Sequence, residues 1–343
     1  MRLHFVSSEV FPLIKTGGLA DVSGALPIAL AAQGVDVQVI MPAYRGVLAQ
    51  CAAATWLGAL QPFYDIRCDL YRTQLPGSNV SLLLVDCPAL YDRDGGPYQH
   101  PSMGEWGDNP LRFGVLSRVA ALLAIPNQIQ AWLPEVVHCN DWQTGLLPYY
   151  LKQLGSPAKS VFSVHNLAFQ GNVHPDWRYR LMLNPQDYQT NGYEFYNQVS
   201  FMKAGLFYAD QLSTVSPTYA REIQTDTFGF GFQGLLQQRA TDLTGILNGI
   251  DTEIWDPSQD SHLPAHYTPD TLSAKRAVKQ ALQAELGLPV SVDTPLFGIV
   301  SRLTYQKGLD MVLDIAEPLL ASGAQLAVLG SGDAQMEQQF VAL

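Results

Sequence analysis

The sequence predicts an α/β protein with two domains, each built on a doubly wound parallel sheet, the second domain being incomplete. Strand-like apolar runs alternate with helix-like runs along most of the chain, which is typical of parallel sheets covered by helices. Polar residues recur directly after the strand-like runs, where such sheets bind ligands. After Pro295 the strand–loop–helix pattern begins again, and this predicts the second domain.

The first 40 residues predict a strand, a glycine loop, a helix and a second strand. Their hydrophobic pattern changes from a continuous apolar run to a helical run and then to alternation. The expected elements are a strand at 3–10, a helix at 25–32 and a strand at 35–40. This is a βαβ unit whose loop lies at the carboxyl end of its first strand.

The loop of this unit contains Lys15, Gly17 and Gly18. A cation and two glycines at a strand-to-helix junction can bring backbone N–H groups to a phosphate without an obstructing side chain. The alternative is that the glycines only form a tight turn and that Lys15 is solvated. The βαβ context favours the phosphate site.

Polar residues also follow two later strands. Asp141 and Trp142 follow a strand expected at 136–138, and His165 and Asn166 follow one at 160–164. Carboxyl ends of parallel strands meet at one edge of a sheet, so we expect these residues to share a crevice with the glycine loop. The other elements expected in this domain are strands at 80–85, 211–215 and 243–248, and helices at 110–124, 146–154 and 218–223.

Each of these polar residues also has a structural interpretation. Asp141 could cap the following helix, Trp142 could belong to the core, and His165 could be a hydrogen-bonded structural residue. The combination favours a sugar site, because such a site needs polar groups for hydroxyls and an aromatic face for the ring. The sequence at 229–234 matches G-x-G-x-x-G, but a helix precedes it, so we expect a flexible loop there.

Proline-rich residues 251–295, with one expected helix at 273–286, predict a connection between a first domain at 1–250 and a second that begins at 296. Its expected elements are a strand at 296–300, a helix at 309–320 and a strand at 325–329. Arg302 and Lys307 flank the loop between the first two, where they could hold a pyrophosphate or simply be solvated. We favour the interpretation that they hold a pyrophosphate, which would lie between two domains that face each other.

The composition narrows the class of protein. The net charge of −11 argues against nucleic acid as a partner. The four cysteines show no metal or redox spacing, so we expect reduced thiols, a cytoplasmic location and no metal. No apolar stretch of about 20 residues predicts a membrane span.

Taken together, the motifs resemble those of bacterial glycogen synthases and related starch synthases, in order and spacing over the whole chain. They are Lys15 to Val22, Asn140 to Trp142, His165 to Gly171, Val215 to Tyr219, Leu247 to Asp251 and Ser301 to Gly308. The resemblance implies two facing Rossmann-like domains, a GT-B type glycosyltransferase, and a retaining hexosyltransferase that moves glucose from ADP-glucose to the non-reducing end of an α-1,4-glucan such as glycogen.

The resemblance also implies roles for single residues. Lys15, Gly17 and Gly18 would contact the donor phosphates, and Arg302 and Lys307 would hold the diphosphate. The sugar and acceptor side would be lined by Asp21, Tyr98, Asp141, Trp142, His165, Asn166 and Asn248. The main-chain carbonyl of His165 would face the positive charge that develops at the anomeric carbon. No cofactor and no metal are implied.

Two features depart from the family. Gln143 stands where a histidine usually follows Asp-Trp, and family members continue well beyond Leu343. From residue 296 on there are too few strands for a complete sheet, so we expect an uncovered apolar face. The alternatives are an inactive glucan-binding fragment and a related retaining transferase that uses another nucleotide sugar.

Overall fold

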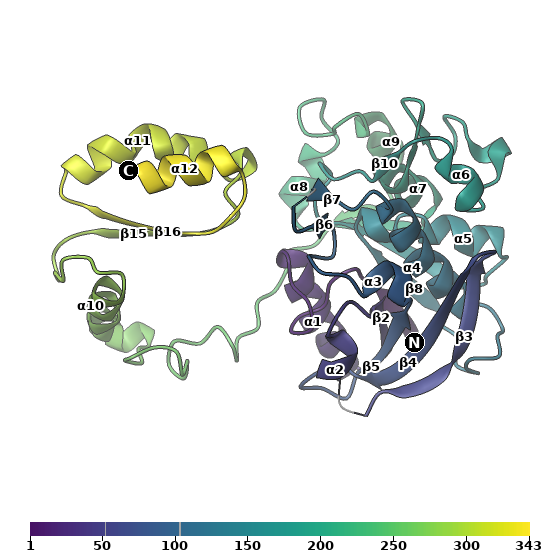
Figure 1. The fold of residues 1–343 in the computed structure, drawn as a ribbon, viewed down its shortest axis with the longest axis horizontal. Coiled ribbons are helices and arrows are strands. Elements are labelled where there is room, and N and C mark those ends of the chain that lie inside the picture. Colours follow the sequence, from purple (N-terminus) through teal and green to yellow (C-terminus); the bar gives the residue numbers. More distant parts are fainter. Residues whose placement is uncertain (52, 103) are drawn as a thin grey trace. The chain divides into compact units, whose positions relative to one another are not determined.

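The computed structural model describes residues 1–51, 53–102 and 104–343, which divide into two compact units. Unit 1 comprises Met1–Gly249 and unit 2 comprises Ile250–Leu343. Figure 1 shows unit 1 in purple to green and unit 2 in green to yellow. Nowhere in the described ranges is there a helix with the length and apolar character that crossing a membrane requires.

Unit 1 is built on a large mixed sheet that, within the described residues, has nine strands. The strands β1, β2, β5, β8, β9, β13 and β14 run parallel, whereas β3 and β4 form an antiparallel edge. In spatial order the strands are β14 (Leu243–Gly245), β13 (Gln211–Thr214), β9 (Lys159–Val164), β8 (Val136–Asn140), β1 (Arg2–Val6), β2 (Asp36–Pro42), β5 (Ser81–Asp86), β4 (Ile66–Gln74) and β3 (Thr55–Phe63).

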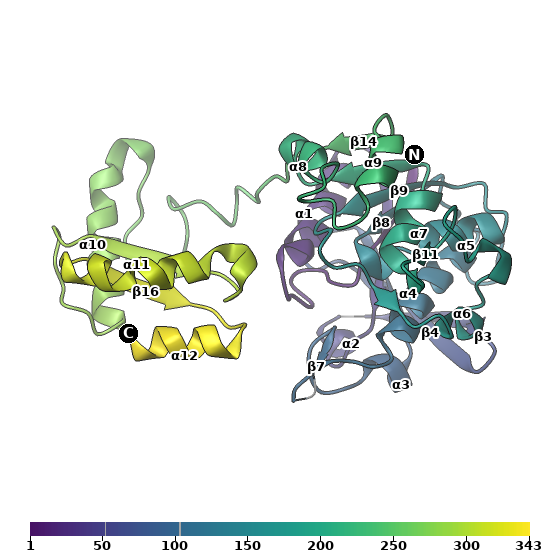
Figure 2. The same ribbon diagram turned by 90° about the horizontal axis from the view of Figure 1, so that it is seen from above.

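Helices cover both faces of this sheet (Figures 1 and 2). Helices α1 and α8 lie on one side, and α4, α5 and α7 lie on the other. Almost every residue of α4 is buried, as expected for a helix packed between a sheet and further helices. The helices of unit 1 are α1 (Gly18–Ala32), α2 (Val47–Gln50), α3 (Pro88–Tyr91), α4 (Asn109–Leu123), α5 (Leu147–Gln153), α6 (Trp177–Arg180), α7 (Phe201–Tyr208), α8 (Pro217–Glu222) and α9 (Gln233–Gln238), with 3₁₀ turns η1 (Trp142–Thr144) and η2 (Pro185–Asp187).

Two small antiparallel sheets lie beside the main one. One is formed by β10 (Asn172–Val173), β12 (Gln198–Ser200) and β11 (Glu194–Phe195), the other by β6 (Gln99–His100) and β7 (Gly104–Glu105). Strands β11 and β12 form a hairpin whose tip is Tyr196 and Asn197.

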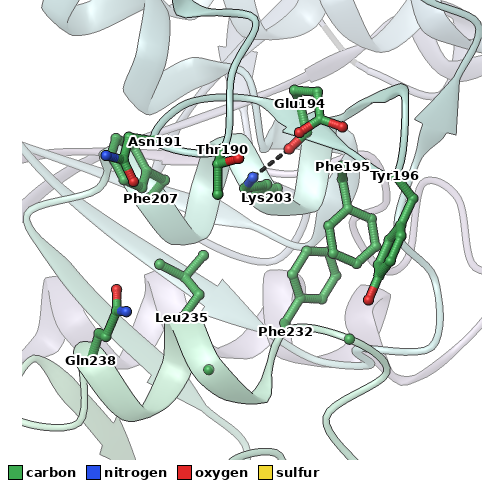
Figure 3. A pocket seen from close by; sticks show the side chains of 12 residues that line it. Thr190, Asn191, Glu194, Phe195, Tyr196, Lys203, Phe207, Phe232, Leu235 and Gln238 are labelled. Atoms are coloured by element: carbon green, nitrogen blue, oxygen red, sulfur yellow. Dashed lines mark hydrogen bonds between the residues drawn. The ribbon is translucent and has the colours of Figure 1, made fainter.

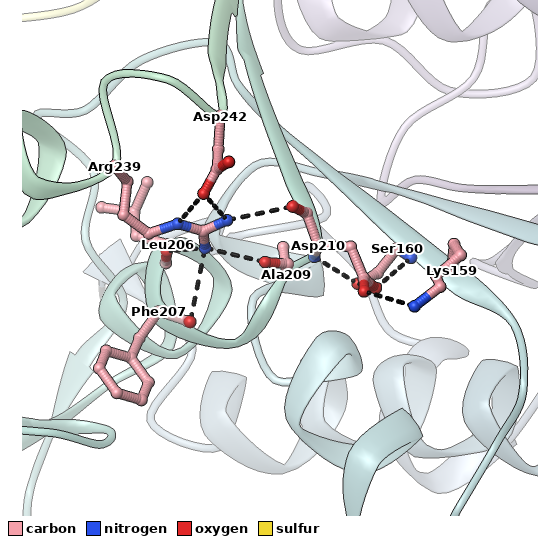
Figure 4. Close-up of polar contacts among 8 residues, drawn as sticks. All are labelled: Lys159, Ser160, Leu206, Phe207, Ala209, Asp210, Arg239 and Asp242. Carbon is pink, nitrogen blue, oxygen red and sulfur yellow. Dashed lines mark hydrogen bonds and ion pairs between the residues drawn. The ribbon is translucent and has the colours of Figure 1, made fainter.

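A polar network holds the amino ends of β9 and β13 in register (Figure 4). The carboxylate of Asp210 accepts the N–H of Ser160 at 2.8 Å and pairs with Lys159 at 3.2 Å. Arg239 pairs with Asp242 at 2.9 Å and donates to the carbonyl oxygen of Ala209 at 2.8 Å. The network ties these strands together at their amino ends, opposite the edge that carries the candidate site.

Unit 2 contains a small parallel sheet of β15 (Leu296–Val300) and β16 (Gln325–Leu329). Its other elements are η3 (Pro269–Ala274), α10 (Lys275–Glu285), η4 (Tyr305–Lys307), α11 (Leu309–Ala321) and α12 (Ala334–Ala342). Helix α10 docks through the buried Gln283, which donates to the side-chain oxygen of Gln325 at 2.7 Å. Apolar strand ends remain exposed, with Val300 at 82% and Leu329 at 70%.

Most elements expected from the sequence are present, but some bounds differ. Strand β1 stops at Val6, four residues early, and its continuation turns away as the hydroxyl of Ser7 donates to the carbonyl oxygen of Glu9. Strand β14 is also short, ending at Gly245. The segment 251–295, expected as a connection, falls within unit 2.

The loop expected at 229–234 is present at 229–232, but its last two residues belong to a helix. Gln233 begins α9, and Phe232 is buried at 1% exposure with its ring stacked on Phe195 at a centroid distance of 4.1 Å. The glycines of this segment suggested conformational flexibility, but the buried pair of aromatic rings holds the segment against β11.

Candidate active site

The carboxyl ends of the parallel strands bring the predicted residues together in unit 1. Strand β8 lies between β1 and β9, so the residues that follow these three strands are neighbours. In the register, Val6 pairs with Cys139, and Asn140 pairs with Ser163. This places the loop after β1, Asp141 after β8, and His165 after β9 along one edge of the sheet.

Asp141 is the centre of the first cluster at this edge. Its Oδ1 accepts the backbone N–H of His165 at 3.1 Å and that of Asn166 at 3.3 Å. The N–H of Asn166 and the carbonyl of His165 belong to one peptide group, and in a trans peptide they point in opposite directions. Asp141 therefore fixes the His165 carbonyl so that it points away from the carboxylate.

The backbone of Asp141 is strained. Its φ of 58° and ψ of −179° fall in a region populated almost only by glycine. Such strain costs about 1–3 kcal/mol and is typical of functional sites. Asp141 does precede η1, but its side chain makes no capping hydrogen bond to that turn. The capping interpretation of Asp141 therefore fails, and its carboxylate serves the neighbouring strand instead.

Burial also changes the acidity of Asp141, which is only 7% exposed. Desolvation raises its pKa to about 7, while the N–H groups of Asn166 and His165 oppose this rise and the nearby charge of Glu9 adds to it. The carboxyl group thus titrates near neutral pH.

His165 is held as a neutral imidazole with one defined tautomer. Desolvation lowers its pKa to about 4. The side-chain N–H of Asn140 donates to the carbonyl oxygen of Val6 at 3.1 Å, so the other side-chain atom of Asn140 is its oxygen. That oxygen lies 3.1 Å from Nε2 of His165, which must therefore carry the proton and donate. The carbonyl oxygen of Val6 on β1 thus orients the side chain of Asn140 on β8, and Asn140 in turn determines the tautomer of His165.

The glycine loop forms the second cluster. Nζ of Lys15 lies 2.7 Å from Oδ1 of Asp21 in an exposed ion pair. Gly17 has an extended backbone with φ of −154°, and neither Gly17 nor Gly18 has a positive φ. A Cβ atom on either would meet nothing within 4 Å. The turn does not require these glycines, so the tight-turn interpretation does not account for them.

The side chain of Glu9 holds this loop through hydrogen bonds to its backbone. Its Oε2 accepts the N–H of Thr16 and, at 3.1 Å, that of Gly17, and Oε1 accepts the hydroxyl of Tyr98 at 2.5 Å. Tyr98 also bonds to the hydroxyl of Ser8 at 2.8 Å. Tyr98 is therefore tied to the base of the glycine loop. The sequence analysis did not identify Glu9 as a site residue. An acidic residue within the apolar run 3–10 is unusual, however, and could have indicated a role in the site.

Trp142, Gln143 and Asn248 occupy different surroundings. The ring of Trp142 packs edge-on against Phe113 and Phe201 at centroid distances of 5.1 and 5.9 Å. Trp142 is thus at least partly a core residue, as its structural interpretation held. Gln143 is buried at 5% exposure. Asn248 is exposed in the segment that follows β14.

Arg302 and Lys307 belong to unit 2. Both are exposed in the segment between β15 and α11, and Lys307 ends the 3₁₀ turn η4. Gly308 follows with a φ of 69°, a left-handed conformation that glycine adopts without strain. Across the described portion of the chain, no group of three or more His, Cys, Asp or Glu side chains is placed to hold a metal ion.

The chain matches the family described as starch synthase catalytic domain over residues 2–238. It is 52% identical to a glycogen synthase of Paramagnetospirillum magneticum and 50% identical to one of Nitrosomonas eutropha. These alignments cover 99% and 100% of this chain, and 70% and 69% of the relatives.

The fold also matches a solved structure. The catalytic domain of starch synthase IV from Arabidopsis thaliana, bound to ADP and acarbose, superposes with a TM-score of 0.86. That match has 27% identity and covers 99% of this chain and 70% of the other. The predicted GT-B type fold class is confirmed. The chain belongs to the starch synthase catalytic domain family and is a glycosyltransferase of the glycogen synthase group.

Proposed function

We propose that this protein transfers glucose from ADP-glucose to the non-reducing end of an α-1,4-glucan, with retention of configuration. The donor class is supported by the starch synthase relative, which was solved with ADP and acarbose bound. The glucan acceptor is supported by the glycogen synthases that align with the whole chain. The proposal includes a cytoplasmic location, which the free state of the four buried cysteines supports.

The observation that carries the proposal is the contact of Asp141 with the His165–Asn166 peptide group. Hydrogen bonding to a carboxylate polarises this peptide and increases the negative character of the His165 carbonyl oxygen. A glucosyl group that loses its nucleotide develops positive charge at the anomeric carbon. A fixed carbonyl dipole that faces this carbon would stabilise the charge without needing to reorient.

The imidazole of His165 contributes through its neutral form. A protonated imidazole beside the anomeric carbon would repel the developing positive charge. Burial keeps the ring neutral, and the bond to Asn140 holds its orientation. His165 therefore acts through its carbonyl and its position rather than by proton transfer.

On the donor side, the open space at Gly17 and Gly18 leaves room for a phosphate at the N-terminus of α1. Lys15 would exchange its ion pair with Asp21 for a bond to that phosphate. Arg302 and Lys307 would supply the remaining positive charge for the leaving diphosphate, so the proposal includes no metal ion and no cofactor.

A glucosyl-transfer assay on glycogen tests this function, with ADP-glucose and UDP-glucose compared in parallel. We expect transfer from ADP-glucose and an α-1,4 linkage in the product by NMR. Preference for UDP-glucose would instead indicate a related transferase. Glycogen binding without ADP release would indicate a glucan-binding protein.

A further inference from the structure

A pocket of about 450 Å³ lies in unit 1, and none of the predicted site residues lines it. It is formed by the β11–β12 hairpin, by α7 and by α9, and its lining includes Tyr196, Lys203 and Gln238 (Figure 3). Its volume is within the range of about 300–1,000 Å³ that is usual for ligand sites.

The rim of the pocket presents an exposed aromatic ring on a strained turn. Tyr196 is 75% exposed, and its φ of 48° is followed by a φ of 63° at Asn197. A two-residue hairpin turn with positive φ at both positions normally uses asparagine or glycine. A tyrosine held there at a conformational cost points to a role for its ring.

The wall beneath this ring is a pair of buried aromatic side chains. Phe195 stacks on Phe232, and the ring of Tyr196 meets that of Phe195 at a centroid distance of 4.7 Å. Gly231 has a φ of 90°, and a Cβ there would lie 2.9 Å from the Phe195 ring. The Phe195 ring, against which Tyr196 packs, is therefore part of the buried core, which limits the entropy lost on binding.

The polar part of the pocket suits a neutral ligand that is rich in hydroxyl groups. Lys203 is only 7% exposed, and its ammonium donates to the main-chain oxygen of Glu194. An ammonium has three N–H donors, so this bond leaves donors for ligand hydroxyls. Lys203 and Glu194 are the charged residues of the lining, and their charges cancel. A phosphate or nucleotide would meet no net positive charge there.

The pocket is connected to the loop that follows β9. The side-chain N–H of Gln170 donates to the carbonyl oxygen of Phe230 at 2.9 Å, and the N–H of Met202 donates to the carbonyl oxygen of Gln170 at 3.0 Å. The loop that begins with His165 therefore continues into the elements that form the pocket.

We propose that this pocket is a second glucan-binding site, in which a glucose unit of the acceptor polymer stacks on Tyr196 and bonds to Lys203 and Gln238. The identity of the ligand rests on the proposed function, because a glucan is the polyhydroxylated polymer which that function brings to the protein. The site would hold one branch of the polymer while another is extended.

The test uses four variants of the full chain and measures binding to glycogen and to maltoheptaose. Tyr196→Ala removes the ring. Gly234→Trp fills the pocket, since Gly234 lines it and a Cβ there meets nothing within 4 Å. Gly234→Ala is its matched control, and Tyr64→Ala removes a tyrosine that is 85% exposed at the β3–β4 turn.

We expect Tyr196→Ala and Gly234→Trp to bind glycogen roughly 3- to 10-fold more weakly in affinity electrophoresis, the loss expected for one aromatic stacking face. Gly234→Ala and Tyr64→Ala should bind as the unchanged protein does. Transfer to maltotriose should be unchanged in all four, whereas KM for glycogen should rise in the first two.

Unchanged glycogen binding in both pocket variants would overturn the proposal. So would weaker binding of ADP in Gly234→Trp with glucan binding intact, because the pocket would then be an anion site. Binding is measured without turnover, so a failure of the proposed transferase activity would be seen separately in the transfer assay.

Discussion

Oδ1 of Asp141 lies 3.1 Å from the backbone nitrogen of His165, and this contact joins the ends of the neighbouring strands β8 and β9. The same oxygen accepts the N–H of Asn166, so one carboxylate holds two successive peptide groups. Asp141 adopts a strained backbone to reach them. The direction of the His165 carbonyl is therefore built into the protein before substrate binds.

The raised pKa of Asp141 predicts a specific pH dependence of stability. A folded-state pKa of about 7, against 3.8 for an unperturbed aspartate, means that ionisation opposes folding. The protonated carboxyl group of Asp141 therefore adds to the free energy of unfolding. This stabilising contribution is fully present below about pH 4 and is lost as the pH rises to about 7. Asp141→Asn removes the titration and keeps a side-chain oxygen that can accept both N–H groups.

From pH 5 to pH 8 we expect the free energy of unfolding of the unchanged protein to fall by roughly 3 kcal/mol relative to that of Asp141→Asn. Urea unfolding at both pH values measures it. The comparison between proteins matters, because buried His138 and His165, whose pKa values are lowered, contribute in the opposite direction. Asp226→Asn, at an exposed position, is the control. Parallel pH profiles for all three proteins would contradict the prediction.

Lys15→Ala should weaken donor binding with little effect on folding. An exposed ion pair such as Lys15–Asp21 contributes only about 0.2–1 kcal/mol to stability. Loss of a charged hydrogen bond to phosphate predicts a rise of roughly 10- to 100-fold in KM for ADP-glucose. Steady-state kinetics and a melting curve measure the two effects. Arg67→Ala, which removes another exposed ion pair, should leave both the KM for ADP-glucose and the melting temperature unchanged. A normal KM would remove Lys15 from the donor site.

Gly18→Ala distinguishes a phosphate site from a simple turn. A Cβ at Gly18 meets no neighbour within 4 Å, and alanine is favoured over glycine within a helix by about 0.5–1 kcal/mol. The variant should fold at least as stably as the unchanged protein. Its KM for ADP-glucose should nevertheless rise, because the methyl group occupies the approach to the N-terminus of α1. Unaltered kinetics would show that a methyl group at this position does not obstruct the donor, which would contradict the phosphate site.

Glu9 should act by positioning the glycine loop. Glu9→Ala removes the acceptor for the N–H groups of Thr16 and Gly17, and we expect KM for ADP-glucose to rise roughly 3- to 10-fold. Glu9→Gln retains an acceptor oxygen and should restore most of the loss. Equal defects in both variants would show that the charge of Glu9, rather than its hydrogen bonds, matters.

Removal of divalent metal ions should leave glucosyl transfer unchanged, since Lys15, Arg302 and Lys307 provide the positive charge for the diphosphate in our proposal. The measurement is the transfer rate in excess EDTA with and without added Mg²⁺. Arg302→Ala and Lys307→Ala should each lower kcat. Activity lost in EDTA and restored by Mg²⁺ would refute this account.

The sequence alone determined the βαβ pattern and the polar residues at strand ends, because hydrophobic periodicity and turn residues are local signals. It did not show the antiparallel edge of β3 and β4, nor the helix that begins at Gln233. Those depend on contacts between distant residues, such as the stacking of Phe232 on Phe195.

Within the site, the sequence named Asp141, His165 and Asn166 but could not say what they do to one another. Only the register of β8 against β9 brings the carboxylate to the two N–H groups, and only burial raises the pKa of Asp141 to about 7. Glu9 shows the same limit, because its role depends on a loop that folds back over it. Residue types are encoded locally, whereas distances, desolvation and tautomers arise when separate strands pack together.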